Sequence, residues 1–196
     1  MAEADMIQAE RDDVPAMVAL LAAAFVDDPP LAWILPDRAD RQSRLATFFE
    51  PIIKGTMRNG LALRSPGDEA VTLWRLPGGI HPGFIETLSG MPAFVRALGD
   101  GAKRAQVLSR SLRTREPDFP YRYLQFAGVA PALKGKGWGG RAVRAGLAQA
   151  RAAGVPVYLE TSKAENVAFY RHLGFNVLQE WDVPEGGPHV WSMLWR

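Results

Sequence analysis

The chain contains no cysteine and no long uninterrupted hydrophobic segment. The lack of cysteine excludes disulfides, thiolate metal sites and a cysteine nucleophile. The lack of a hydrophobic run argues against a membrane-spanning helix, which needs about 18 consecutive apolar residues. The first residues are acidic and lack a basic start followed by an apolar core. We therefore expect no secretory signal, no membrane partner and a cytoplasmic location.

Histidine and net charge are also scarce. The three histidines lie far apart without the spacing of metal ligands, so we expect no metal site. The net charge of +2 is too small to indicate a nucleic-acid surface. One basic run follows a helical pattern without interleaved aromatic residues, and we interpret it as a solvated helix face, with no nucleic-acid partner. Its members are Lys103, Arg104, Arg110, Arg113 and Arg115.

What is present is typical of a soluble globular domain. Hydrophobic residues make up 47% and charged residues 22% of the 196 residues, which favours one ordinary core over disorder. No internal repeat or linker-like tract divides the chain. We therefore predict a single domain over residues 1–196, present as a monomer or a homodimer.

Hydrophobic spacing predicts helices in the first half of the chain. Apolar residues at helical spacing follow Asp12-Asp13-Val14-Pro15, an acidic start with proline in the first turn. A longer helix is predicted from about Ala39 to Met57. A hairpin follows, with strands at 61–64 and 70–76. Residues 77–118 are interrupted by proline and glycine, and we expect two helices there.

The C-terminal third has a clearer order of elements. Its pattern predicts a strand at 121–129, a glycine-rich turn, a helix to about 153, a strand at 155–161, a helix at 164–173 and strands at 176–183 and 189–194. Ser162 and Glu165 predict a capping box for the second helix. A parallel strand pair joined by a crossover helix, followed by a helix and a hairpin, indicates an α+β (α/β-like) fold with a mixed sheet.

The glycine-rich turn carries the strongest functional signal. Its sequence is Val129-Ala130-Pro131-Ala132-Leu133-Lys134-Gly135-Lys136-Gly137-Trp138-Gly139-Gly140. Glycines allow positive φ and let backbone amides approach a ligand, while a helix start adds unpaired N–H groups and a positive dipole end. The turn therefore favours a phosphate ligand, with Lys134 and Lys136 beside it.

Several interpretations of this turn compete. A P-loop is excluded because Ala130 stands where its first glycine belongs. A dinucleotide fingerprint is satisfied by Gly135, Gly137 and Gly140, with Glu160 about 20 residues later. The elements after the turn, however, do not supply the further βαβ repeats of a dinucleotide-binding protein. A flexible loop without a ligand is the remaining structural alternative.

The third functional interpretation comes from a family resemblance. Lys134-Gly135-Lys136-Gly137-Trp138-Gly139 resembles the pyrophosphate turn Gln/Arg-x-x-Gly-x-Gly/Ala of the GNAT superfamily, with lysine replacing glutamine or arginine. The resemblance continues through Leu159-Glu160-Thr161-Ser162 and through residues 166–175. Over residues 121–196 the sequence looks closest to the puromycin N-acetyltransferase branch of that superfamily.

This resemblance implies the GNAT fold, a central mixed sheet of about six or seven strands flanked by helices, in which splayed parallel strands form the cofactor cleft. Residues 119–196 are then mainly the acetyl-CoA side, and residues 1–118 mainly the acceptor side. The resemblance assigns cofactor binding to Ala127, Gly128, Val129, Lys134, Gly135, Lys136, Gly137, Trp138, Gly139, Gly140 and Asn166.

The resemblance also implies direct transfer of an acetyl group from acetyl-CoA to a primary amine of a small molecule, possible acceptors being aminonucleosides or antibiotic-like amines. Tyr170 lies four residues after Asn166 on one helix face and is the candidate general acid for the leaving thiolate. Glu160 is the candidate base. A core tyrosine and a strand-end carboxylate in an ion pair are the structural alternatives for these two residues.

The acceptor pocket is less defined by the sequence. Phe25, Asp28, Trp33 and Tyr123 are candidate lining residues, because an acidic side chain beside aromatic rings suits a cationic amine. Core packing explains Phe25 and Trp33 equally well. A noncatalytic acyl-CoA-binding sensor is the alternative function, since it would keep the glycine turn without needing Tyr170.

Overall fold

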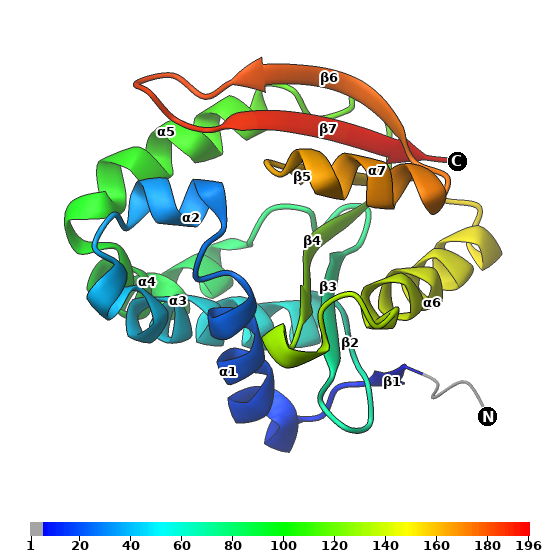
Figure 1. The fold of residues 1–196 in the computed structure, drawn as a ribbon, viewed down its shortest axis with the longest axis horizontal. Coiled ribbons are helices and arrows are strands. Elements are labelled where there is room, and N and C mark those ends of the chain that lie inside the picture. The colour runs from blue at the N-terminus through cyan, green and yellow to red at the C-terminus, as the bar shows by residue number, and fades with distance from the viewer. Residues whose placement is uncertain (1–5) are drawn as a thin grey trace.

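A seven-stranded sheet runs through the molecule in the computed structural model, which describes residues 6–196 (Figure 1). The strand order is β1-β2-β3-β4-β5-β7-β6, and β4 and β5 form a parallel pair among antiparallel neighbours. The strands are β1 (Ile7–Gln8), β2 (Gly60–Arg64), β3 (Ala70–Arg75), β4 (Arg122–Val129), β5 (Val157–Thr161), β6 (Asn176–Asp182) and β7 (His189–Trp195). The predicted α+β fold with a mixed sheet is confirmed.

Helices cover both faces of this sheet. They are α1 (Val14–Ala24), α2 (Pro29–Ile34), α3 (Arg38–Asn59), α4 (Phe84–Leu98), α5 (Ala102–Arg113), α6 (Trp138–Ala152) and α7 (Ala164–His172). Successive side chains of a strand point to opposite faces. Leu73 of β3 therefore packs with α1 and α3, whereas the next residue, Trp74, packs with α6. The two hydrophobic clusters hold β3 and β4 in place between helices.

Gly146 marks the point where α6 crosses Trp74. A Cβ atom at residue 146 would overlap the indole ring of Trp74, which is fully buried. We expect Gly146→Ala to lower the free energy of unfolding by about 1–3 kcal/mol, although alanine is the better helix former, because overpacking outweighs propensity. Urea denaturation measures the change. A midpoint equal to or above that of the unchanged protein would contradict the tight α6–β3 contact.

The predicted elements of the first half are confirmed with small shifts of their ends. Helix α3 continues through Pro51 over residues 38–59, and α4 and α5 are the two helices expected between residues 77 and 118. Pro29 and Pro30 open α2 at its first positions, because proline tolerates a helix start.

The predicted capping box of α7 is wrong. The N-cap residue is Lys163, and its side chain makes no cap hydrogen bond. Thr161 replaces the predicted cap: its Oγ1 accepts hydrogen bonds from Lys163 N at 3.5 Å and from Asn166 Nδ2 at 3.1 Å. The last residue of β5 therefore anchors the start of α7.

Part of the basic run has partners within the molecule. Arg104 donates to the carbonyl oxygen of Ile34 at 2.9 Å, and the Arg115 guanidinium lies 4.7 Å from the centre of the Trp181 ring. These contacts tie α5 to α2 and to β6, as expected of a helix on the protein surface. Nowhere in residues 6–196 does a helix combine the length and apolarity needed to cross a membrane.

Candidate active site

Strands β4 and β5 separate after their first residues. Their ladder joins Arg122 to Val157 and Tyr123 to Tyr158, and it contains no other pair within the described residues. Both strands nevertheless continue, β4 to Val129 and β5 to Thr161. The facing backbone edges beyond the ladder are therefore not paired with each other. Such edges can pair with an extended ligand, as a sheet edge pairs with an added strand.

A bulge in β4 lies next to the point of separation. On the β3 side, Leu73 pairs with Phe126 and Trp74 pairs with Leu124, which leaves Gln125 as the extra residue. A bulge bends its strand and increases the local twist. The Gln125 side chain is held there, because its Oε1 accepts a hydrogen bond of 3.2 Å from Arg75 Nε. The bulge thus accounts for the turn of β4 away from β5.

The glycine turn has the backbone conformation that its sequence predicts. Gly135 and Gly137 have φ values of +79° and +85°, and Gly137 is the N-cap of α6. A Cβ atom at either residue would meet no other atom within 4 Å, so backbone conformation, and not crowding, requires these glycines. Arg141 N donates to Gly137 O at 3.2 Å, so the amides of residues 138–140 precede the intrahelical hydrogen bonds. Lys134 and Lys136 are exposed beside these amides.

Other predicted cofactor residues also have contacts within the protein. A Cβ atom at Gly128 would lie 2.7 Å from Leu21 Cδ2, so the approach of α1 to β4 requires this glycine. Ala127 packs on the opposite face, in the cluster that contains α6. A Cβ atom at Gly139 would contact the Phe169 ring of α7 at an ordinary 3.5 Å. The start of α6 therefore lies against Phe169 of α7.

Glu160 lies on β5 just beyond the parallel ladder. Its Oε2 atom is buried and has no hydrogen-bond partner among the described residues. Burial raises the pKa of Glu160 to about 7, an effect that the nearby hydroxyls of Tyr123 and Tyr158 oppose in part and the charge of Glu116 reinforces. A carboxylate with a pKa near neutrality can accept a proton from a substrate and release it again.

Tyr170 is buried on α7 between two aromatic rings. Its ring centre lies 5.0 Å from that of Phe169 and 5.5 Å from that of Phe175. Burial raises the pKa of the Tyr170 hydroxyl above its usual value, and the negative charge of Asp28 adds to this shift. The hydroxyl is therefore protonated at neutral pH, which is the state that a general acid requires.

Asp28 lies near Tyr170, and Lys163, the N-cap residue of α7, lies near Asp28. Asp28 is the N-cap residue of α2, and burial raises its pKa to about 6, while the nearby Lys163 lowers it. The charge of Asp28 in turn raises the pKa of the Tyr170 hydroxyl. The structure thus brings the predicted residues Asp28 and Tyr170 together, although they come from opposite halves of the chain.

The remaining predicted acceptor residues divide into two groups. Tyr123 lies near Glu160. Burial, and then the charge of that carboxylate, raise the pKa of the Tyr123 hydroxyl. Phe25 instead packs between Phe126 and Phe49 at ring distances of 5.4 and 5.6 Å, and Trp33 packs against two hydrophobic clusters. These contacts support the packing interpretation of both residues.

Sequence reasoning missed three polar residues of this region. Tyr158 could have been found, because it lies two positions before Glu160 and so shares its strand face. Glu116 lies in residues 77–118, where proline and glycine interrupt the hydrophobic pattern. Lys163 lies at the start of α7, and no motif in the sequence marked it as a functional residue. Among the described residues, no group of three or more His, Asp or Glu side chains is arranged to hold a metal ion.

Comparisons with known proteins agree with this geometry. Residues 93–175 match the model of the acetyltransferase (GNAT) family. An uncharacterized N-acetyltransferase of Schizosaccharomyces pombe is 28% identical over 177 residues, which cover 85% of this chain and 72% of that protein.

Solved structures extend the likeness to nearly the whole chain. A crystal structure described as histone acetyltransferase HPA2 and related acetyltransferase, from Corynebacterium glutamicum, has a TM-score of 0.73 and 25% identity, covering 97% of this chain and 94% of that one. Arylalkylamine N-acetyltransferase 2 from Aedes aegypti shares the fold, with a TM-score of 0.61, 13% identity and 96% coverage of both chains. The chain therefore has the fold of the GNAT acetyltransferases, and residues 93–175 match the model of that family.

Proposed function

We propose that the chain is an enzyme that moves an acetyl group from acetyl-CoA directly to a primary amine of a small molecule. One observation carries this proposal. Strands β4 and β5 part between a glycine turn at the start of α6 and a buried carboxylate, Glu160, with a raised pKa. An acyl-CoA needs a diphosphate site at one end of such an opening and proton-transfer groups at the reacting end.

The residues present fit acetyl-CoA. The positive-φ glycines 135 and 137 have open space in front of them, and the free amides at the start of α6 suit the negative charge of a diphosphate. The backbone of Ala127, Gly128 and Val129 borders the opening on β4 and suits the amide groups of the pantetheine arm. Asn166, held by Thr161 at the other border, is a candidate contact of the same arm.

Glu160 and Tyr170 divide the proton transfers between them. In the proposed reaction Glu160 accepts a proton from the substrate ammonium group, directly or through water, and the free amine attacks the acetyl carbonyl carbon. The bond between this carbon and sulfur breaks, and Tyr170 donates its proton to the thiolate. The new amide nitrogen loses its extra proton, and this proton restores the Tyr170 hydroxyl. No protein side chain carries the acetyl group, so the lack of cysteine is no obstacle.

The glycine turn offers a direct test of cofactor binding. Gly137→Ala forces alanine into a positive φ at the start of α6, so we expect the dissociation constant for acetyl-CoA to rise about 10-fold or more. Calorimetric titration measures it. Gly154→Ala is the matched control, because Gly154 has φ +63°, equally open surroundings and a place after the other end of α6. Equal affinities in both variants would contradict diphosphate binding at the turn.

Several finer assignments belong to the same proposal. Residues 119–196 supply mainly the acetyl-CoA side, and residues 1–118 supply mainly the acceptor side. The comparisons support the superfamily, whereas membership of the puromycin N-acetyltransferase branch stays a prediction from residues 121–196. Arylalkylamine N-acetyltransferase 2, which shares the fold, carries a small amine acceptor in its name, and this supports a small amine as acceptor here.

A further inference from the structure

A cavity of about 340 Å³ opens between two connecting segments, the one from β3 to α4 and the one from α5 to β4. Its walls combine polar groups with proline and aromatic side chains, and its ionisable side chains are those of Glu116, His81 and Tyr121. The lining residues are Pro77, Gly78, Ile80, His81, Glu116, Pro117, Phe119, Pro120 and Tyr121. One carboxylate among aromatic faces is a suitable environment for an organic ammonium ion.

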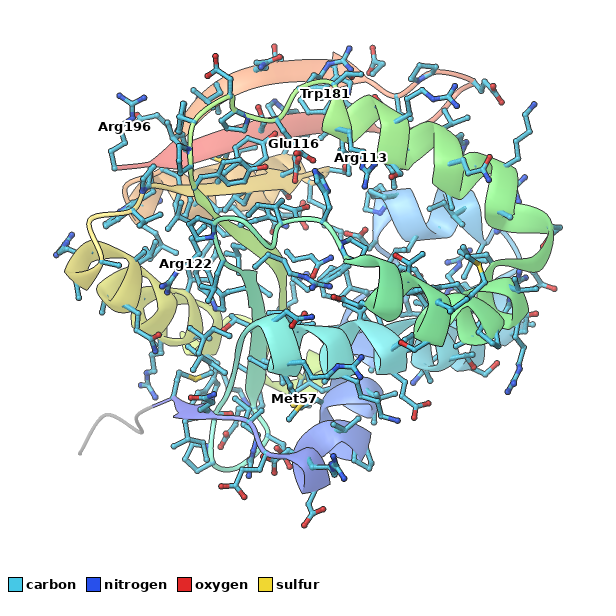
Figure 2. The ribbon with its side chains drawn as sticks, turned by 180° about the vertical axis from the view of Figure 1, so that it is seen from behind. Met57, Arg113, Glu116, Arg122, Trp181 and Arg196 are labelled. Atoms are coloured by element: carbon cyan, nitrogen blue, oxygen red, sulfur yellow. The ribbon has the colours of Figure 1, made fainter. Side chains whose placement is uncertain are left out.

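The Glu116 carboxylate in this cavity is paired with the His81 side chain, which another cation could replace. Its Oε2 atom lies 3.0 Å from His81 Nε2, and the two side chains are 21% and 47% exposed. Histidine carries a full charge only when it is protonated, whereas an alkylammonium group is charged throughout the neutral range. Figure 2, which shows the molecule from behind, labels Glu116 near the end of α5, where the connection to β4 begins. A soluble ammonium ion can therefore compete with His81 for the carboxylate.

Tyrosine side chains connect this cavity with Glu160. Tyr121 lines the cavity, and its ring centre lies 5.2 Å from that of Tyr158, which stands beside Glu160. The pKa of Tyr121 is raised first by burial and then by the charges of both Glu116 and Glu160, so the two carboxylates lie within electrostatic reach of each other. A molecule with two separated cationic groups could pair with both carboxylates at once.

We infer that Glu116 determines acceptor specificity: it binds a second cationic group of the acceptor in this cavity while the reacting primary amine lies at Glu160. The acceptor class is a diamine or a comparable dication whose spacer is long enough to reach from the cavity to Glu160. This inference rests on the proposed acetyl transfer and adds the substrate class. No covalent step is added, since Glu116 only pairs with a charge.

The test compares α,ω-diamines of increasing length with monoalkylamines of the same lengths, using thiol release from acetyl-CoA. For one diamine length we expect a kcat/KM at least about 10-fold above that of the matching monoamine, as one well-placed ion pair supplies. In Glu116→Gln this ratio is expected to fall about 10-fold. Using the ratio cancels any effect of Glu116 on the ionisation of Glu160.

Two matched variants separate recognition from folding and from general charge. Asp118→Asn removes the same charge from the same segment, but Asp118 does not line the cavity, so its ratio should stay within about 2-fold. His81→Gln removes the competing cation and should keep or raise the ratio. If Glu116→Gln kept the diamine-to-monoamine ratio of the unchanged protein, the role of Glu116 would be overturned. An equal fall of this ratio in Glu116→Gln and His81→Gln would also overturn it. Neither result would affect the proposed acetyl transfer. Absence of transfer to every amine would overturn the proposed function itself.

Discussion

Replacing Tyr170 by phenylalanine is expected to lower kcat by about 10²- to 10⁴-fold, the range that general acid catalysis supplies. Phenylalanine keeps the aromatic packing between Phe169 and Phe175 and removes only the hydroxyl. The leaving thiolate then lacks a proton donor, so the chemical step slows. Steady-state kinetics with saturating acetyl-CoA and amine measures this effect.

Two further measurements make the Tyr170→Phe result specific. Calorimetry should give an acetyl-CoA dissociation constant close to that of the unchanged protein, and the melting temperature should show that the variant is folded. The hydroxyl is protonated at neutral pH, as tyrosine is at its ordinary pKa, and burial and then Asp28 raise this pKa further. An unchanged kcat would remove Tyr170 from the mechanism and leave it as a core residue.

Glu160→Gln is the second change with a large expected effect. Glu160 acts as a base only when it is ionised, and its pKa is raised to about 7. In the unchanged protein kcat/KM should therefore rise about 10-fold per pH unit at low pH and level off above about pH 7. In the glutamine variant we expect the rising limb of the pH profile at low pH to disappear, and kcat/KM at pH 8 to fall about 10²-fold or more.

A pH profile of kcat/KM from pH 5 to 9 tests this assignment. Glu165→Gln on α7 is the matched control, because it removes an exposed carboxylate from the neighbouring helix and should preserve the limb. If Glu160→Gln retained the same limb with the same midpoint, another group would be the base. Asp28 would then be the first alternative, because burial raises its pKa to about 6.

The local features of the site were predictable from the sequence. The glycine turn follows from residues next to one another, since the strand before it and the helix after it are both clear in the hydrophobic pattern. Gly135 and Gly137 do have the positive φ that such a turn requires. The parallel pair was also predictable, because a strand, crossover helix and strand leave few other arrangements.

Contacts between distant segments were not predictable in the same way. The approach of Asp28 to Tyr170 and Lys163 depends on how the connection between α1 and α2 is placed relative to α7, and no local pattern encodes that placement. Glu116 reaches the cavity because the connection from α5 to β4 passes Tyr121, in a region where proline obscures hydrophobic periodicity. Gly128 has a packing role that the sequence did not indicate: the approach of α1 requires glycine there, whatever its predicted contact with the cofactor.

The proposed activity is the transfer of an acetyl group to an amine, and not merely the binding of an acyl-CoA. Thiol release from acetyl-CoA, followed at pH 8 with and without each member of a panel of primary amines, tests it most directly. We expect release that depends on an amine and is lost in Tyr170→Phe and Glu160→Gln. Tight binding of acetyl-CoA with no release for any amine, or no binding at all, would contradict it.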